Sequence, residues 1–71
     1  MKVPRDVSGG EAVRALRRLG FQIVRQEGSH IRMTKGSVRI TVPNHKTIRP
    51  KTLQSMLRQA GVSVEEFLEA L

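Results

Sequence analysis

Residues 28–43 read GSHIRMTKGSVRITVP and contain two consecutive stretches in which apolar and polar side chains alternate. In the first stretch Ile31 and Met33 alternate with polar residues, and the second stretch repeats the pattern as VRITV at 38–42. An alternation with period two is typical of a β-strand that buries one face. Residues 28–43 therefore predict a β-hairpin, which ends at Pro43 because proline has no N–H for a strand ladder.

The dipeptide Lys-Gly at residues 35–36 lies between the two stretches and fits the two-residue loop of a tight hairpin. With this loop Arg32 lies directly opposite Arg39, and His30 lies opposite Thr41. The apolar side chains then share one face of the sheet, and the other face is polar. Opposed arginines repel each other in a sheet, so the pair indicates a site for an anion such as phosphate. Two separate, solvated side chains explain the same pattern equally well.

A helix and a further strand are predicted before the hairpin. Ser8 and Glu11 have the spacing of a capping box, in which each side chain bonds the backbone N–H of the other residue. Apolar residues then recur at helical spacing up to a glycine, so we predict a helix over residues 9–19. Phe21 and Ile23 follow with period two and predict a short strand with one face buried.

Two helices are predicted after the hairpin. Pro50 suits the first turn of a helix whose apolar residues recur at helical spacing until Gly61. Ser63 and Glu66 form a second capping box, which begins a short last helix over about residues 64–70. The predicted order is α-β-β-β-α-α. This is an α+β fold in which the helices cover the apolar face of a three-stranded antiparallel sheet.

The composition is strongly basic and points to a polyanionic partner. The chain has 71 residues, enough for a single domain over residues 1–71, with 13 Lys and Arg against 6 Asp and Glu. The three glutamates after residue 61 are accompanied by no basic residue, so the charge before them is more positive than the overall +7. Such a surface attracts nucleic acid, the commonest polyanion, although a merely soluble basic protein fits the composition too.

Several other classes of protein do not fit the sequence. The chain has no cysteine, so disulfides and thiolate zinc sites are excluded. No stretch approaches the roughly 20 apolar residues of a membrane span. The start contains Lys2 and Arg5, but no apolar run follows as in a signal peptide. We therefore expect a cytoplasmic protein with no membrane partner.

His30 is the candidate catalytic residue. It begins the second strand just after Gly28, so its imidazole is expected at the rim of the polar face. Imidazole titrates near pH ~6.5, which suits RNA cleavage, where a base activates the 2′-hydroxyl and an acid protonates the leaving oxygen. Arg32 and Arg39 would stabilise the charge on the phosphorane. The sequence lacks a carboxylate cluster for Mg²⁺, so we expect no metal and no other cofactor.

Further polar residues follow the third strand. We expect its loop to bring His45 near His30, where it supplies a second acid or base, holds the substrate or caps the loop. Lys46, Arg49 and Lys51 surround the predicted start of the next helix. Helix N-termini favour anions, so this cluster indicates phosphate binding, with a solvated basic loop as the alternative.

Taken together, these residues resemble the HicA toxin family, also called YcfA-like proteins. The resemblance is carried, in chain order, by LGF (19–21), GSH (28–30), VPNH (42–45), TL (52–53), LRQAGVS (57–63) and EEF (65–67). It covers essentially the whole chain, although Lys51 stands where a glycine is common in the family.

The resemblance implies a double-stranded-RNA-binding-domain-like fold and an mRNA interferase activity. It implies a metal-independent endoribonuclease that acts as the toxin of a type II toxin–antitoxin system and arrests growth by cleaving mRNA. The histidine of the Gly-Ser-His motif, His30, would be catalytic, and we add Ser29 of the same motif to the residues that contact RNA. A HicB-like antitoxin would cover the active face.

Two other functions remain open at this point. One is a non-catalytic RNA-binding module of the same fold, which recognises duplex shape and phosphates. The other is a small basic interaction protein, such as a ribosome-associated factor. His30 discriminates between them and the nuclease, because a pure binder gains little from one histidine at the rim.

Overall fold

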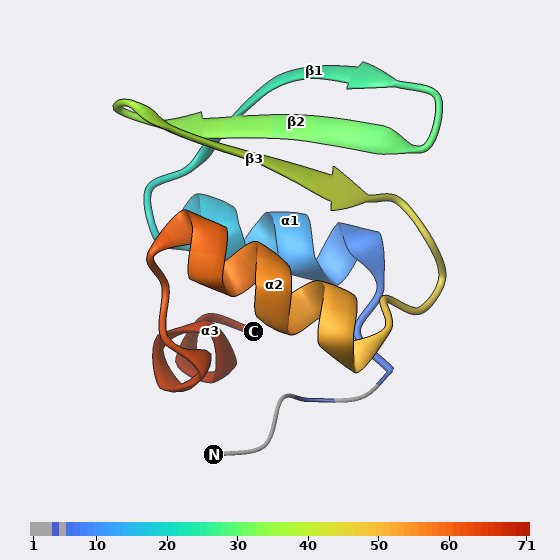
Figure 1. The fold of residues 1–71 in the computed structure, drawn as a ribbon, viewed down its shortest axis with the longest axis vertical. Coiled ribbons are helices and arrows are strands. Elements are labelled where there is room, and N and C mark those ends of the chain that lie inside the picture. The colour runs from blue at the N-terminus through green and yellow to red at the C-terminus, as the bar shows by residue number, and fades with distance from the viewer. Residues whose placement is uncertain (1–3, 5) are drawn as a thin grey trace.

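The computed structural model describes residues 4 and 6–71. Lys2 and Arg5, which the prediction about a signal peptide concerned, lie outside the described residues. The elements are α1 (Gly9–Arg18), β1 (Gln22–Glu27), β2 (His30–Lys35), β3 (Val38–Pro43), α2 (Pro50–Ala60) and α3 (Val64–Ala70). This is the predicted order, and the predicted double-stranded-RNA-binding-domain-like α+β fold is confirmed (Figure 1).

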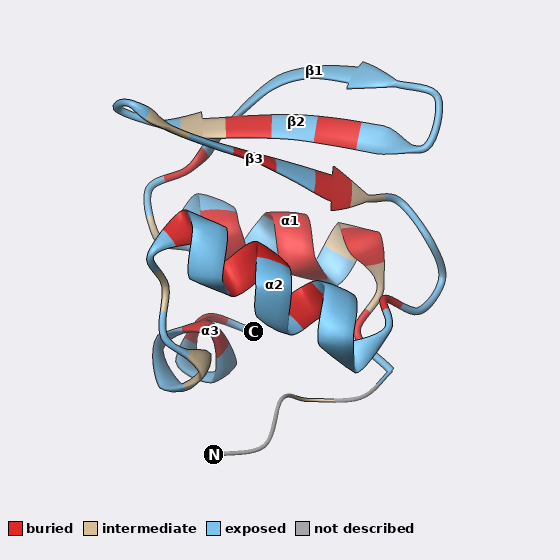
Figure 2. Ribbon diagram, viewed as in Figure 1, coloured by how far each residue is buried: buried red, intermediate tan, exposed pale blue. Residues whose placement is uncertain are grey.

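The sheet is antiparallel, with strand order β1-β2-β3, and α1 and α2 lie against one of its faces (Figure 1). Ile31 and Met33 of β2 and Ile40 and Val42 of β3 are buried, as their period-two spacing predicts. They pack with the apolar sides of the helices in a single core (Figure 2). The opposite face of the sheet is consequently left uncovered.

The helix boundaries follow from local chemistry. In each capping box the serine Oγ accepts a hydrogen bond from the glutamate N–H, at 3.1 Å in Ser8–Glu11 and 3.0 Å in Ser63–Glu66. α2 has proline in its first turn and ends at Gly61, whose φ of +70° suits a residue without a Cβ. No helix in the described part of the chain is long and apolar enough to cross a membrane.

The loop between β2 and β3 differs from the prediction. It consists of residues 36–37, Gly-Ser, instead of 35–36, and Lys35 is still within the strand, opposite Val38. Gly36 has a φ of +61° at the first central position of the turn, where glycine is favoured in one of the two common hairpin turns. The predicted loop placed this glycine at the second central position, and that placement was wrong.

The corrected loop shifts the register of this hairpin by two residues. The opposed pairs are His30 with Pro43, Arg32 with Thr41, and Thr34 with Arg39. A shift of two keeps every side chain on its predicted face, because strand side chains alternate with period two. The predicted direct opposition of Arg32 and Arg39 was wrong, although both lie on the open face.

β1 also differs from the prediction, because it buries none of its residues. Phe21 is in the core but precedes the strand, whereas Ile23 is 46% exposed and Val24 59% exposed. β1 is an edge strand that lies beyond the helices (Figures 1 and 2), so neither of its faces is covered. The register shifts between Ile23 and Arg25, which is typical of a β-bulge and interrupts the alternation.

Candidate functional site

His30 is exposed at the first position of β2 and lies on the uncovered face of the sheet. Four side chains line one hollow around it: Glu27, His30, Arg32 and Thr41. β1 supplies the first of these, β2 the next two and β3 the last. The imidazole is therefore open to solvent and accompanied by both a carboxylate and a guanidinium.

Glu27 lies directly opposite His30 across the β1–β2 hairpin. This pairing follows from the two-residue turn at Gly28 and Ser29, in which Gly28 has a φ of +57° at the first central position. Glu27 was not among the site residues predicted from the sequence. The turn rule applied to Gly28 and Ser29 would have placed it beside the histidine.

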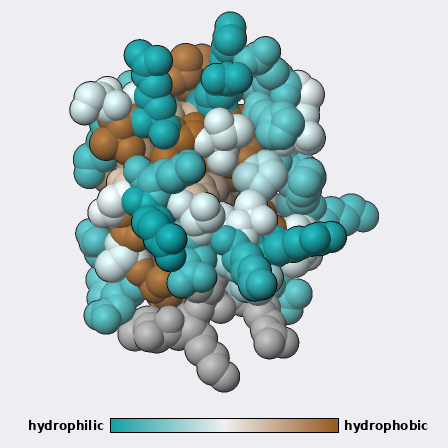
Figure 3. Space-filling model, viewed as in Figure 1, coloured by the Kyte–Doolittle hydropathy of each residue, from teal (hydrophilic) through white to brown (hydrophobic). Residues whose placement is uncertain are grey.

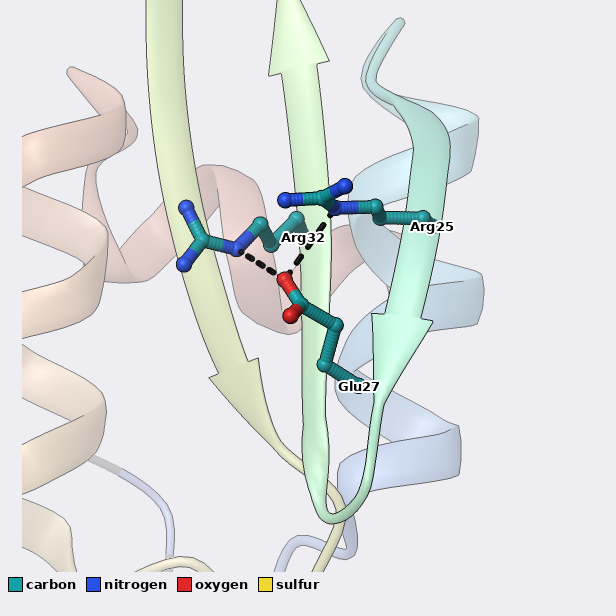
Figure 4. Close-up of polar contacts among 3 residues, drawn as sticks. All are labelled: Arg25, Glu27 and Arg32. Carbon is teal, nitrogen blue, oxygen red and sulfur yellow. Dashed lines mark ion pairs between the residues drawn. The ribbon is translucent and has the colours of Figure 1, made fainter.

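The Glu27 carboxylate bridges two arginines (Figure 4). Its Oε1 atom is 3.1 Å from Nε of Arg25 and 3.1 Å from Nε of Arg32. Arg25 is opposite Arg32 in the sheet, so the carboxylate separates two like charges that would otherwise repel each other. All three side chains are more than half exposed, so the attraction is screened by water and the contacts are weak.

A second, larger hollow, lined by residues of all three strands and by Gln59 of α2, brings the arginines together. Arg25, Arg32 and Arg39 line it with Thr41, and its lining includes no acidic side chain. Arg32 and Arg39 thus share a site although they are not directly opposite, and Arg25 is a third guanidinium that the sequence analysis missed. Planar guanidiniums with several donors suit phosphate, so this surface matches the sugar-phosphate backbone of a nucleic acid.

The loop after β3 is tied to the His30 turn by its backbone. The N–H of Asn44 donates to the carbonyl of Ser29 at 2.6 Å, and the N–H of Gly9 donates to the carbonyl of His45 at 2.8 Å. Gly9 approaches this loop so closely that an added Cβ would lie 2.6 Å from Pro43 O and 2.7 Å from Asn44 Cα. The start of α1 therefore holds the loop against the turn that positions His30.

The remaining predicted site residues are only partly brought together. The backbones of Ser29 and His45 belong to the fixed loop contacts, and the side chain of His45 is exposed. Lys51 lines a third hollow, between α2 and Thr41 of β3. Lys46 and Arg49 are exposed and line none of these three hollows. In the described part of the chain, no three histidine or acidic side chains are grouped to hold a metal ion.

A comparison with protein-family models matches residues 9–62 to the HicA toxin of bacterial toxin–antitoxin systems. The chain belongs to the HicA toxin family. The match spans most of the chain, from the start of α1 past the end of α2, and includes every residue of the open face described above. A comparison with curated proteins gave no match.

Membership of the HicA toxin family makes the chain a toxin of a toxin–antitoxin system. Toxins of this family are generally enzymes that cleave mRNA, and membership of a toxin–antitoxin family indicates an antitoxin partner. α3 lies after the matched residues, and Arg18 of α1 holds it by donating to the carbonyl of Ala70. The basic open face and α3, with its three glutamates, are thus different parts of the molecule.

Proposed function

We propose that the chain is a metal-independent endoribonuclease, an mRNA interferase, in which His30 is the catalytic side chain. The observation that supports this most is the exposed position of His30 at the first residue of β2, in one hollow with Arg32. A base or acid must be accessible to the ribose, and the phosphate must meet positive charge. Both conditions are met on one face of the sheet.

The chemistry requires two proton transfers. A base removes the proton from the 2′-hydroxyl, the 2′-oxygen attacks phosphorus, and the bond from phosphorus to the 5′-oxygen breaks. An acid then protonates this leaving oxygen, giving a 2′,3′-cyclic phosphate and a 5′-hydroxyl. His30 carries out one of the two transfers, and guanidiniums stabilise the phosphorane. Glu27 and His45 are the two candidates for the other transfer.

Glu27 has a further role in the free protein. Its carboxylate holds Arg25 and Arg32 at the place where an RNA phosphate would bind, through their Nε atoms. Because the contacts are exposed and weak, a phosphate with several oxygens competes for the same guanidiniums. Glu27 thus holds the two arginines in position until RNA binds.

The partner that we propose is a HicB-like antitoxin with an acidic surface that covers the same face. This proposal is supported by the toxin–antitoxin family and by the net charge of +7. Electrostatic complementarity accelerates association at low salt. Rising salt should therefore slow formation of the complex, whereas a complex whose association does not respond to salt would argue for an apolar interface elsewhere.

The experiment that tests the proposed activity is cleavage of RNA by the purified chain in the presence of EDTA. We expect cleavage, with fragments that carry 2′,3′-cyclic phosphate and 5′-hydroxyl ends. Fragments with 5′-phosphate ends, or cleavage that stops in EDTA, would contradict the proposed chemistry. RNA binding without cleavage would favour the non-catalytic RNA-binding module.

A further inference from the structure

α2 presents a polar row of side chains beside the open face of the sheet. Lys51, Ser55 and Gln59 are spaced by four residues, which places them along one side of the helix. All three are exposed and line the hollow between α2 and β3 together with Thr41. The buried side of the same helix, with Leu53 and its apolar neighbours, packs into the core.

This hollow adjoins the arginine hollow. Gln59 and Thr41 line both of them, and Thr41 also lines the hollow around His30. α2 lies alongside β3 and runs antiparallel to it (Figures 1 and 4). A path therefore leads from His30 across Thr41 to the side of α2, whose Gln59 lies toward the Arg39 end of β3 and whose Lys51 lies toward the opposite end of that strand.

The chemistry of this path suits a nucleic-acid backbone. The side of α2 contributes one ammonium group, one hydroxyl and one amide, from Lys51, Ser55 and Gln59, and Thr52 adds a second hydroxyl. Side chains of these types make many of the phosphate and sugar contacts in protein–nucleic acid complexes. No acidic side chain lines either hollow.

We propose that Lys51, Ser55 and Gln59 form a subsite for the sugar-phosphate backbone of the RNA strand that is cut at His30. The strand crosses the sheet at Thr41 and continues along α2, so the subsite binds nucleotides on one side of the scissile bond. The proposal rests on the proposed function for its ligand, RNA, but not on catalysis. The exposed side of α2 would then bind substrate, while its buried side packs in the core.

Two pairs of matched variants on α2 test the subsite. Gln59→Glu places a negative charge in the hollow between α2 and β3. Gln54→Glu places the same charge at an exposed position outside the three hollows. Lys51→Gln removes one positive charge inside the same hollow, and Arg58→Gln removes one positive charge outside it. Binding is measured by fluorescence anisotropy with a single-stranded RNA oligonucleotide and with a dinucleotide, in a His30→Ala background that prevents cleavage.

We expect Gln59→Glu to weaken binding of the oligonucleotide by about tenfold, since a like charge then faces a phosphate. Lys51→Gln should lower the slope of log affinity against log salt by about one. Both variants should lose less affinity for the dinucleotide, because it is too short to occupy both the hollow at His30 and the subsite. Gln54→Glu and Arg58→Gln should bind both RNAs like the parent.

The outcomes separate this proposal from the proposed function. Equal effects of Gln59→Glu and Gln54→Glu would overturn the subsite while leaving RNA as the ligand of the sheet. If the two variants in the hollow weaken RNA binding as expected but the wild type never cleaves RNA, the subsite is supported and the nuclease activity is refuted. A wild-type chain that binds no RNA would overturn both.

Discussion

Glu27 and His30 face each other across the β1–β2 hairpin, and the Glu27 carboxylate contacts Arg25 and Arg32 at 3.1 Å each. The free protein therefore holds an anion of its own at the site where we propose that RNA phosphate binds. This arrangement explains how Arg25 and Arg32 are tolerated directly opposite each other in the sheet. It also makes Glu27 a residue whose removal changes RNA binding in a direction opposite to that of the arginines.

Replacing Glu27 by Gln should tighten RNA binding roughly two- to fivefold at low salt, because one exposed negative charge is removed beside the phosphate. The matched control is Glu69→Gln on α3, which makes the same charge change away from the sheet. Binding is measured in the His30→Ala background. In the His30-containing protein, a loss of cleavage with unimpaired binding would identify Glu27 as the second acid or base, whereas retained cleavage would leave His45 for that role.

Arg32→Ala and Arg39→Ala should each weaken RNA binding and lower its salt dependence by about one unit of slope. The physical reason is that each guanidinium that contacts phosphate releases bound counterions from the RNA. Arg17→Ala, at an exposed position on α1, serves as the control. Unchanged salt slopes in the two sheet variants would show that the open face does not bind phosphate.

Gly9→Ala should reduce the free energy of unfolding by about 1–3 kcal/mol, because its Cβ would meet the backbone of residues 43–44, which cannot move cheaply. Gly10→Ala is a close control, since the same added methyl would meet only side-chain atoms, at 3.9 and 4.0 Å. That variant should keep or gain stability, by up to about 1 kcal/mol, through better helix propensity. Urea denaturation of both variants measures the difference, and similar losses in both would refute the proposed close approach.

Stability should fall in acid because of the two capping boxes. The backbone N–H of Ser8 lowers the pKa of Glu11 below its ordinary value of 4.5, and the backbone N–H of Ser63 does the same for the pKa of Glu66. A carboxyl whose pKa is lower in the folded state stabilises the fold above 4.5. This contribution is lost as the pH falls through the lowered pKa of the folded state.

The double variant Glu11→Gln/Glu66→Gln tests this linkage, because glutamine keeps the box but does not titrate. We expect its free energy of unfolding to change less steeply with pH below 4.5 than that of the wild type, as measured by urea denaturation at a series of pH values. Glu65→Gln/Glu69→Gln is the matched control, because it removes two carboxylates of α3 that lie outside the capping boxes. An equal pH dependence of the free energy of unfolding in the two double variants would contradict the proposed role of the capping boxes.

Much of the fold could be predicted because its signals are local. The capping boxes, the helix-ending Gly61 and the period-two stretches of β2 and β3 depend only on near neighbours in the sequence, and the structure confirms them. The hairpin register was wrong because Gly36 fits two alternative loops. The repeated Gly-Ser pair, at 28–29 and again at 36–37, favours the loop observed and would also have placed Glu27 opposite His30.

Other features depend on how distant elements meet and could not be read from spacing. Ile23 was predicted on the buried side of a strand, but β1 is the edge strand of the sheet and Ile23 is exposed. Figure 3 shows apolar patches between mostly hydrophilic side chains on one face of the molecule, so not every apolar residue is in the core. That Gln59 lines one hollow with Arg39 follows only from the packing of α2 along β3.

The catalytic role of His30 is tested by comparing RNA cleavage by the wild type and by the His30→Ala variant at equal RNA occupancy. We expect cleavage and growth arrest in the wild type and neither in the variant, with RNA binding and the thermal unfolding temperature retained. Cleavage by the purified His30→Ala protein at the rate of the wild type would contradict the assignment of His30 as the catalytic side chain.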